Sequence, residues 1–420
     1  MKSFEKSEAF LKRAETVIPL GSQTFSKSRV HFPVGAAPLF IAKGDGARVW
    51  DIDGNEYTDF INGLASITLG YNDPDVTGAV KSQIDDGVIF SLPHPLETEV
   101  AELIVDMVPC AEMVRFGKNG SDATAGAIRL ARAYTGRDHV AVCGYHGWQD
   151  WYIGTTSRNQ GVPKAVSDLS HPFAYNDLEG LKAVMAAHKL AAVILEPMNI
   201  AYPKDGFLER LAEITREHGA LLIFDEMLTG FRFAPGGAQE LFGVTPDLAT
   251  YGKGLANGYP LAAVAGKAEI MHLMEEIFFS FTMGGECLSL AAAKAVLQKV
   301  RDQGVTEHLA SLGQQILDGT GRLIESTQCG HFLSTSGHPA WSFLHFANLE
   351  IKTLYMQEML ARGFLTFGTH NMSFAHAQSD AEALLSAYEE VFPMLSTAVA
   401  NDNVKDHLRC EPLVPLFQVR

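Results

Sequence analysis

The sequence predicts an α/β protein whose mainly parallel sheet is covered by helices on both faces. Between about residues 96 and 300, helical patterns alternate with short apolar runs that are bounded by turn residues. Three of these runs are His139-Val140-Ala141-Val142, Ala192-Val193-Ile194-Leu195 and Leu221-Leu222-Ile223-Phe224. Short runs that are apolar throughout are typical of strands buried on both faces. Strands that alternate with helices pair in parallel, because each helix returns the chain to the same end of the sheet.

The two ends of the chain show other patterns. An amphipathic helix is expected over residues 4–18, and strands are expected over residues 39–41 and within residues 48–57. Asp53-Gly54-Asn55 is a typical hairpin turn inside the second of these segments. One long helix is expected over about residues 288–320, before a final region of mixed strands and helices. No repeat, low-complexity tract or flexible linker is apparent, so we expect tightly packed domains.

The composition is that of a globular enzyme. Of the 420 residues, 47% are hydrophobic and 20% are charged, and the formal net charge is −16. An acidic chain repels nucleic acids and anionic membrane surfaces, so we expect neither as a partner. The five cysteines are scattered without a CxxC pair, which suits a reducing compartment. No signal peptide and no uncharged apolar stretch of about 18 residues is apparent, so a cytoplasmic location is expected.

Asp225 and Lys253 form the most informative pair of residues. Asp225 directly follows an apolar run, which places its carboxylate at the carboxyl end of a central strand. Lys253 lies 28 residues later between two glycines, which allow a sharp turn and the close approach of a ligand. Enzymes that use pyridoxal 5'-phosphate (PLP) need such an amine, and a carboxylate that keeps the pyridine nitrogen protonated. The alternatives are a helix cap or an ion pair for Asp225 and a solvated surface position for Lys253. Met227 either packs under a planar ring or belongs to the core.

Two further segments contain candidate ligand-binding groups. Gly120, Ser121 and Asp122 open a helical pattern, where free N–H groups suit either a phosphate or a plain helix cap. Tyr145 and Trp148 follow the apolar run that ends at position 142. Their rings would stack on a flat cofactor or line a pocket, or else belong to the core or to an interface.

Other polar positions give weaker signals. Glu196 is a second carboxylate at a strand end, and Thr282 lies in a polar turn before a helix, where it is a second candidate phosphate contact. The 15 histidines include no HExxH motif and no pairing with cysteine at ligand spacing, so we expect no metal site. His370 and His376 are interpreted as pocket or packing residues.

Eight segments of the chain follow one another in an order known from one enzyme family. They are Phe40 to Asp59, Leu69 to Pro74, Ser121 to Arg137, Tyr145-His146-Gly147, Glu196-Pro197, Phe224-Asp225-Glu226, Thr229 to Arg232 and Tyr251 to Pro260. Together they resemble class III (fold type I) PLP-dependent aminotransferases, and most of all the glutamate-1-semialdehyde aminomutase branch. The resemblance covers nearly the whole chain. Each motif is modest alone, but the ordered set is highly specific.

The resemblance implies the fold type I PLP-transferase architecture, a large domain with a mainly parallel sheet between helices and a smaller α/β domain from both termini. Residues 1–75 are then expected to contribute to the small domain and to a dimer interface. Residues 76–310 would form the large PLP-binding domain, and residues 311–420 the C-terminal small domain.

The resemblance also implies the cofactor site. Lys253 would form the Schiff base with PLP, and Asp225 would pair with the pyridine nitrogen. Gly120 and Ser121, with Asp122 beside them, would bind the cofactor phosphate, which Thr282 of the neighbouring subunit would also reach. Tyr145 and Met227 would contact the cofactor ring. Glu196 would lie near the 3-hydroxyl group. The family's homodimer with shared active sites is therefore implied.

The expected reaction transfers an amino group between a small polar or anionic amine, or an amino sugar, and a carbonyl acceptor. A lyase that eliminates ammonia or a phosphate-type leaving group, and an intramolecular aminomutase, are the alternatives, because one carbanion serves all three outcomes.

The substrate pocket is predicted from five residues. Lys27 or Arg29 would bind a substrate anion, while Trp148, Trp151 and His370 would shape the pocket. The sequence departs from the aminomutase pattern at Trp148, around Glu286 and at Gly368, so we do not expect glutamate semialdehyde as the substrate.

Overall fold

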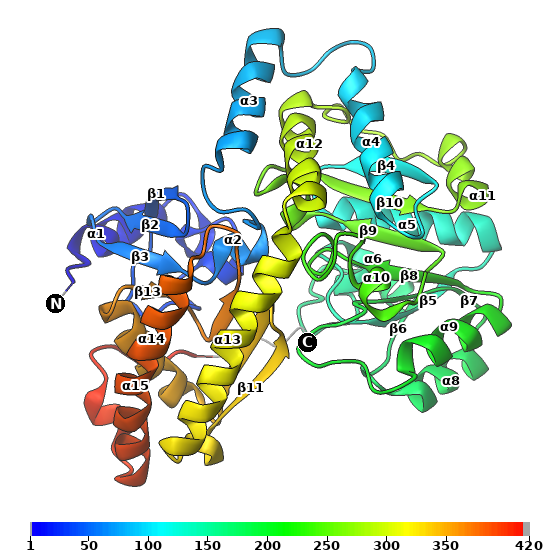
Figure 1. The fold of residues 1–420 in the computed structure, drawn as a ribbon. Coiled ribbons are helices and arrows are strands. Elements are labelled where there is room, and N and C mark those ends of the chain that lie inside the picture. The colour runs from blue at the N-terminus through cyan, green and yellow to red at the C-terminus, as the bar shows by residue number, and fades with distance from the viewer. Residues whose placement is uncertain (1, 415–420) are drawn as a thin grey trace. The chain divides into compact units, whose positions relative to one another are not determined.

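The computed structural model describes residues 2–414 of the chain (Figure 1). These residues form two compact units, each described by itself. Unit 2 comprises residues 74–306, and unit 1 comprises residues 2–73 together with residues 307–414. Within the described part of the chain, no helix is both long enough and apolar enough to cross a membrane.

A seven-stranded sheet forms the centre of unit 2 and confirms the predicted mainly parallel sheet. Its strands, in spatial order, are β4 (Met113–Gly117), β10 (Ala262–Gly266), β9 (Leu248–Tyr251), β8 (Leu221–Asp225), β7 (Leu190–Leu195), β5 (His139–Cys143) and β6 (Ser170–Pro172). Only β10 runs antiparallel to its neighbours. The three predicted apolar runs are β5, β7 and β8, and every residue of β7 and β8 is buried.

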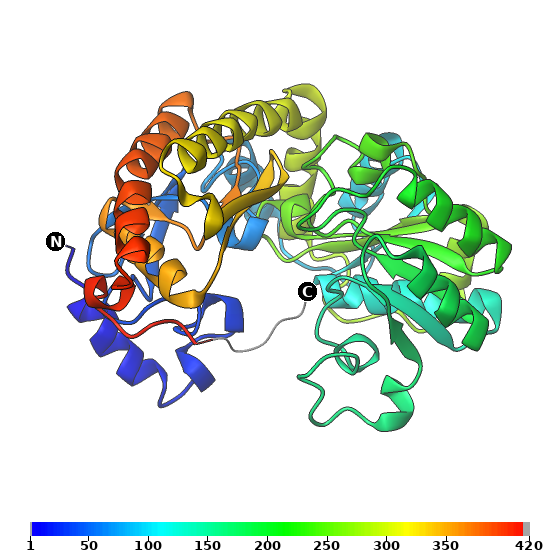
Figure 2. The same ribbon diagram turned by 90° about the horizontal axis from the view of Figure 1, so that it is seen from below.

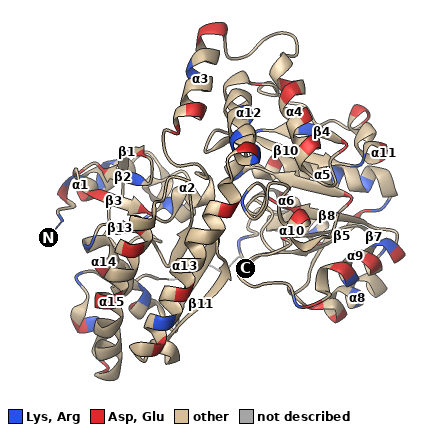
Figure 3. Cartoon of the chain, viewed as in Figure 1, with Lys and Arg blue, Asp and Glu red and all other residues tan. Residues whose placement is uncertain are grey.

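Helices cover both faces of this sheet, as predicted. The helix α5 packs along β7 to β10 on one face, while α8 and α9 lie on the opposite face (Figures 1 and 2). Acidic and basic positions are interspersed along α8 and α9 (Figure 3), which fits an outer, solvated surface. The helices of unit 2 are α3 (Pro74–Asp86), α4 (Pro95–Met107), α5 (Gly120–Thr135), α6 (Asp150–Ile153), α7 (Lys164–Ser167), α8 (Leu178–Ala187), α9 (Phe207–Glu217), α10 (Ala238–Phe242), η3 (Lys253–Ala256), α11 (Ala268–Met271), η4 (His272–Glu275) and α12 (Cys287–Asp302).

The strand directions gather several chain segments at one edge of the sheet. The strands β5, β7, β8 and β9 are mutually parallel, and the register pairs Asp225 at the end of β8 with Thr250 in β9. The strand β4 has the same direction as β9, because both are antiparallel to β10. The segments that follow these five strands therefore emerge together, which is where open α/β sheets bind their ligands.

Unit 1 is assembled from both ends of the chain, and the parallel pair Phe364↔Thr58 joins them in one sheet. Its strands are β1 (Ile41–Asp45), β2 (Arg48–Asp51), β3 (Glu56–Asp59) and β13 (Phe364–Leu365) in one sheet, and β11 (Leu333–His338), β12 (Trp341–Phe346) and β14 (Thr369–Asn371) in the other. Its helices are α1 (Glu5–Ala14), η1 (Pro19–Gly21), η2 (Phe25–Lys27), α2 (Asn62–Ala65), η5 (Cys329–His331), α14 (Leu349–Ala361), α15 (Gln378–Ala400) and η6 (Val404–His407).

Three predicted elements differ from the structure. The single long helix is wrong: α12 ends at Asp302, and α13 (Val305–Ser326) starts after Gly304, whose φ of +63° cannot continue a right-handed helix. The first helix ends at Ala14 rather than near position 18, and the residue before Pro19 is extended, as proline requires. The first strand begins only at Ile41.

Candidate active site

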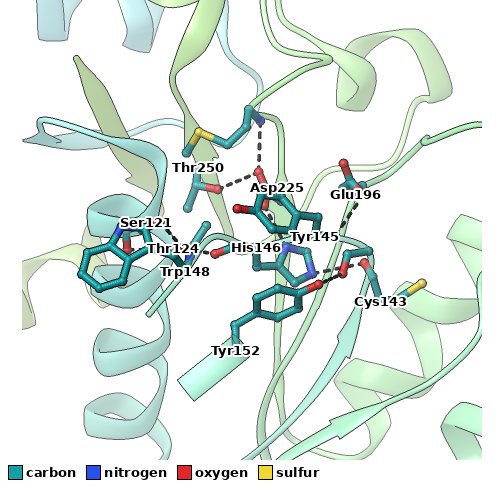
Figure 4. Close-up of polar contacts among 12 residues, drawn as sticks. Ser121, Thr124, Cys143, Tyr145, His146, Trp148, Tyr152, Glu196, Asp225 and Thr250 are labelled. Carbon is teal, nitrogen blue, oxygen red and sulfur yellow. Dashed lines mark hydrogen bonds and ion pairs between the residues drawn. The ribbon is translucent and has the colours of Figure 1, made fainter. Parts of the chain in front are cut away.

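Asp225 is held by three hydrogen-bond donors at the carboxyl end of β8 (Figure 4). Its side chain is only 2% exposed, and its Oδ2 accepts a hydrogen bond of 2.7 Å from His146 Nδ1. Its Oδ1 accepts from the Met227 backbone N–H at 3.1 Å and from the Thr250 hydroxyl at 3.4 Å. A buried carboxylate is costly unless it is paired and hydrogen bonded, so these contacts compensate for its removal from water.

His146 is the side chain that lies closest to the Asp225 carboxylate. Its ring is fully buried, and its Nε2 lies 3.2 Å from the carbonyl oxygen of Cys143. A carboxylate only accepts hydrogen bonds, so Nδ1 is the donor in the contact with Asp225. The two contacts fix the orientation of the ring. Trp151 stacks parallel to the ring, and Tyr152 meets it edge-on at 5.2 Å between centroids.

Lys253 follows β9, the strand that pairs with the strand of Asp225. Thr250, which contacts Asp225, lies three residues before it. The φ of Lys253 is +44°, a left-handed conformation that costs a non-glycine residue on the order of 1–3 kcal/mol and is found mainly where the surrounding structure enforces it. A Cβ at the preceding Gly252 would lie 2.7 Å from Met227 Sδ, so a side chain there would require Met227 to move. Strain of this kind is concentrated at functional sites.

Glu226 stabilises the chain segment that leaves β8. Its carboxylate accepts hydrogen bonds from the backbone N–H groups of Ala238 at 2.8 Å and Gln239 at 2.9 Å, and from the Thr229 hydroxyl. Burial raises the pKa of Glu226, although these donors lower it. Glu226 thus attaches the first turn of α10 to the end of β8 and fixes the loop between them.

The first turn of α5 is closed by a reciprocal cap. Asn119 Oδ1 accepts from the backbone N–H groups of Ser121 at 3.0 Å and Asp122 at 3.2 Å, and Asp122 Oδ2 accepts from the Asn119 N–H at 3.0 Å. Asp122 therefore has a local capping role. A Cβ at Gly120 would lie 2.9 Å from Met227 Sδ, so this helix starts beside the segment that follows Asp225.

Ser121 connects the start of α5 to the segment after β5. Its hydroxyl oxygen accepts a hydrogen bond of 3.1 Å from the Trp148 backbone N–H. Among the described residues, we find no acceptor for the hydroxyl proton itself, which leaves it available to an anion. Gly147 has a φ of +104°, and a Cβ there would overlap Ser121. The close approach of these two segments thus depends on this glycine.

Tyr145 and Glu196 follow β5 and β7, as predicted. Glu196 Oε2 accepts a hydrogen bond of 3.1 Å from the Tyr145 N–H. The Tyr152 hydroxyl donates to the Gly144 carbonyl oxygen at 2.7 Å, which fixes the turn between β5 and Tyr145. Burial, with the Glu196 charge as a second cause, raises the pKa of the Cys143 thiol to about 12, so this cysteine is not a nucleophile at neutral pH.

Thr282 lies in an exposed turn directly before α12, as predicted. Glu286 ends this turn, and its carboxylate accepts from the Leu288 N–H at 2.7 Å at the helix start. Lys118 Nζ, one residue before the cap of α5, donates to Glu286 Oε2 at 2.8 Å. Burial alone would raise the pKa of Glu286, but Lys118 and the other donors hold it below its usual range. The two helix starts are thereby joined by an ion pair.

The predicted substrate residues belong to different units. Lys27 and Arg29 are exposed in unit 1, where Arg29 Nε donates to Glu15 at 2.5 Å. Trp148 belongs to unit 2, and its residue is 67% exposed. Their roles toward a substrate stay predictions.

His370 lies fully buried in unit 1. Its Nδ1 is 2.9 Å from the Ser342 hydroxyl, and its Nε2 is 2.8 Å from the Tyr388 hydroxyl. Burial lowers the pKa of His370 to about 4, so the ring is neutral at pH 7. These contacts hold the ring within unit 1, and its role toward a substrate stays a prediction.

Two polar partners of Asp225 were not predicted from the sequence. His146 stands inside the quoted Tyr145-His146-Gly147 motif, and Thr250 lies in the segment before Lys253. Both residues lie near the ends of predicted neighbouring strands, and these ends meet at one edge of the sheet. This position is the sequence feature that could have indicated their contact with Asp225.

Comparisons with known proteins agree with this arrangement. A family described as aminotransferase class-III matches residues 31–331. The 3-aminobutyryl-CoA aminotransferase of Cloacimonas acidaminovorans (strain Evry) is 33% identical over 412 residues, which cover 93% of this chain and 98% of the relative. A glutamate-1-semialdehyde 2,1-aminomutase of Syntrophobacter fumaroxidans is 36% identical over 397 residues, covering 86% of this chain and 91% of the relative. The FumI protein of Sphingopyxis sp. MTA144, solved in its PLP internal aldimine form, has a TM-score of 0.88 at 28% identity and covers 97% of this chain and 99% of its own.

Proposed function

The chain belongs to the class III aminotransferases, which use PLP, and on this premise we propose that it transfers an amino group between a small polar or anionic amine, or an amino sugar, and a carbonyl acceptor. The observation that supports this most strongly is the buried Asp225 carboxylate, paired with His146 at a strand end beside the Lys253 turn.

The chemistry of the surrounding groups fits PLP. Lys253 offers an amine, Asp225 a carboxylate for the pyridine nitrogen, and Ser121 a hydroxyl proton for the phosphate. Gly120 and Gly252 both lie against the Met227 side chain, so the start of α5 and the turn before Lys253 lie close to the segment that follows Asp225. We assign Tyr145 and Met227 to the two sides of the ring on the family pattern, and Glu196 to its 3-hydroxyl side.

Bound PLP supplies an electron sink for the electron pair that remains when the substrate C–H bond breaks. The chain's residues then have distinct tasks. Asp225 keeps the pyridine nitrogen protonated, and His146 orients Asp225 through its hydrogen bond. Lys253 Nζ takes the proton from the substrate carbon and returns it as general base and acid.

Within the predicted anion site, we infer that Lys27 is the better candidate. The Nε of Arg29 is already engaged by Glu15, whose negative charge offsets that of the guanidinium and weakens its attraction for a substrate anion. Lys27 is exposed, and no ion pair involves it among the residues described. Lys27→Ala should raise KM for an anionic amine and leave KM for a neutral amine unchanged, whereas Arg29→Ala should change neither. The reverse pattern would assign the anion to Arg29.

The reaction is tested with a panel of β-amino acids, terminal amines, amino sugars and glutamate semialdehyde, each with and without a keto acid. Transfer of the amino group to the keto acid in equal amounts supports the proposal. Release of ammonia without an acceptor would reject transamination. An isomerised product without an acceptor would support the second candidate, an aminomutase, which the 36% identity to an aminomutase favours. Lys253→Ala is the control that should abolish every one of these reactions and the visible absorbance of the bound cofactor.

We also propose a homodimer in which Thr282 reaches the cofactor phosphate of the neighbouring subunit. The turn of Thr282 lies close to the α3–α4 connection, since the Cys287 N–H donates to the Val88 carbonyl oxygen at 2.8 Å. Large apolar side chains are exposed from the end of α3 through the α3–α4 connection and in the segment around Thr282, and such groups of apolar side chains are rarely left in water. The exposed residues are Ile84, Val88, Ile89, Phe90, Leu92, Phe278 and Met283.

A complementation experiment distinguishes a shared site from a local one. Lys253→Ala and Thr282→Asp chains are each inactive under the proposal, but a mixed dimer has one site that combines Lys253 of one chain with Thr282 of the other. Recovery of about a quarter of the native activity on statistical mixing supports the shared site. No recovery, with mixed dimers demonstrated by two different tags, would show that Thr282 acts within its own subunit.

A further inference from the structure

Three histidines meet at the amino end of the unit 2 sheet, opposite to the edge of Asp225. His139 is the first residue of β5, His171 lies in β6, and His188 follows α8 just before β7. One ligand nitrogen from each ring lies within 4.8 Å of those of the other two. The register pairs His171 with Ala141, two residues after His139, so the side chains of His139 and His171 point to the same face of the sheet.

The distances among the rings suit a metal ion. His139 Nδ1 and His171 Nε2 are 2.9 Å apart. Two imidazole nitrogens bound at about 2.0–2.1 Å are about 2.9 Å apart when they subtend a right angle at the metal, and about 3.3 Å apart at a tetrahedral angle. The rings of His171 and His188 are stacked at 3.8 Å with 14° between their planes, so one ring must rotate for both nitrogen lone pairs to point at the same ion. The three ligand nitrogens lie within 4.8 Å of one another, so the third needs a shift of up to about 2 Å to reach the ligand spacing.

The backbone holds the three residues in place without a metal. The strands β5 and β6 are paired over Val140↔Ser170 and its neighbours, and the His188 N–H donates to the Val184 carbonyl oxygen at 3.0 Å to end α8. Arg137 Nη1 donates to the Leu190 carbonyl oxygen at 2.9 Å at the start of β7. A ligand set carried on strands and a helix end is more rigid than one on loops, which favours metal binding.

The chemistry of the ligands selects the class of ion. Three imidazoles without a carboxylate suit Zn²⁺, Cu²⁺, Ni²⁺ or Co²⁺ rather than the oxygen-seeking Mg²⁺ or Ca²⁺. The three histidines are only half-buried, so solvent can fill the remaining coordination positions.

We propose that His139, His171 and His188 bind one divalent transition-metal ion, with Zn²⁺ as the ion to test first. The bound ion would join β5, β6 and the connection from α8 to β7. Because the site lies at the far end of the strands from Lys253, we expect it to stabilise unit 2 without taking part in amino transfer. This proposal does not depend on the substrate of the enzyme.

The test uses the untagged full-length holoenzyme, freed of metal by dialysis against a chelator and then titrated calorimetrically with Zn²⁺. We expect one Zn²⁺ per chain and a higher Tm in the loaded protein. His139→Gln and His188→Gln should each weaken binding by at least about ten-fold. His272→Gln, an exposed histidine of the same unit, is the matched control and should bind as the wild type does.

The outcomes separate binding at this site from binding elsewhere. Absence of uptake, or uptake that is equal in the wild type and in both variants, would overturn the proposal. If His139→Gln fails to fold, His188→Gln at the helix end and the electron paramagnetic resonance spectrum of the Cu²⁺-loaded wild type decide the question. The spectrum should show coupling to several nitrogens, and a spectrum with oxygen ligands alone would refute a three-histidine site.

Discussion

Replacing His146 with leucine removes the partner that lies closest to Asp225. The contact between His146 Nδ1 and Asp225 Oδ2 is 2.7 Å, and the two side chains are 0% and 2% exposed. Breaking a buried ion pair by removing one partner costs on the order of 3–5 kcal/mol, since the other charge is left uncompensated. The Met227 N–H and the Thr250 hydroxyl still reach the other carboxylate oxygen at 3.1 and 3.4 Å, so we expect the lower end, about 3 kcal/mol.

The loss should depend on the cofactor. In the cofactor-free protein, the His146→Leu variant lacks the nearest hydrogen-bond donor of Asp225. In the holoenzyme, the proposed pyridinium nitrogen provides one, so the loss should be smaller by about 1 kcal/mol or more. The assay is urea unfolding of both forms, with activity measured on the same samples. Thr250→Val is the matched control: it removes only the 3.4 Å contact with the same carboxylate and should cost less than about 1 kcal/mol.

The role of His146 follows from how the loss of stability differs between the cofactor-free protein and the holoenzyme. If His146 only fills space, His146→Leu should destabilise the two forms equally, and His146→Gln should restore nothing. If the ring is the charge partner, His146→Gln should recover part of the loss, because its amide still donates a hydrogen bond. A loss below 1 kcal/mol in the cofactor-free protein would show that Asp225 does not need its partner.

Three further predictions concern the site, acid stability and the core. Gly147→Ala should weaken PLP binding at least ten-fold in a cofactor titration, because the new Cβ would overlap Ser121. Gly161 is the matched control, since its φ of +92° is similar but the space around it is open. Gly161→Ala should therefore show only the backbone cost of about 1 kcal/mol in urea unfolding. Burial lowers the pKa of His370 to about 4 from 6.5, so the unfolded chain takes up a proton between pH 6.5 and 4 that the folded chain does not. The free energy of unfolding should therefore fall by up to about 3 kcal/mol as the pH drops through this window, and His370→Gln should flatten the fall; an unchanged profile would refute the assignment. Ile194→Ala in the middle of β7 should cost about 2–5 kcal/mol in urea unfolding, since Ile194 is fully buried; a loss below 1 kcal/mol would show that the surrounding core closes the cavity.

The sequence predicted those features that local patterns determine. The apolar runs at β5, β7 and β8 gave the sheet, because strands buried on both faces contain no polar position. Asp225 was placed correctly at a strand end because the apolar run stops there. The start of α5 at Gly120 was also correct, since Asn119 and Asp122 form a recognisable cap.

Features that depend on distant residues were not predicted. His146 and Asp225 are 79 positions apart. Nothing in the sequence around either residue indicates that the His146 ring nitrogen faces the Asp225 carboxylate. The break between α12 and α13 was missed because a single glycine inside a helical pattern is usually tolerated, and only the φ of +63° at Gly304 shows that the chain turns. The three histidines at the amino end of the sheet come from three different elements, so no ligand spacing is visible in the sequence.

The position of this histidine cluster explains why its metal should leave catalysis unchanged. A strand rises about 3.3 Å per residue, so His139 lies about 13 Å along β5 from Cys143, and the segment with Tyr145 and His146 starts only beyond that point. This exceeds the Debye length of about 8 Å at physiological ionic strength, so a half-exposed ion acts only weakly on the charge of Asp225. Loading with Zn²⁺ should therefore raise the Tm while kcat and the pH profile stay the same. A shift of the pH profile on loading would instead require the two ends of β5 to be coupled through a movement of the strand.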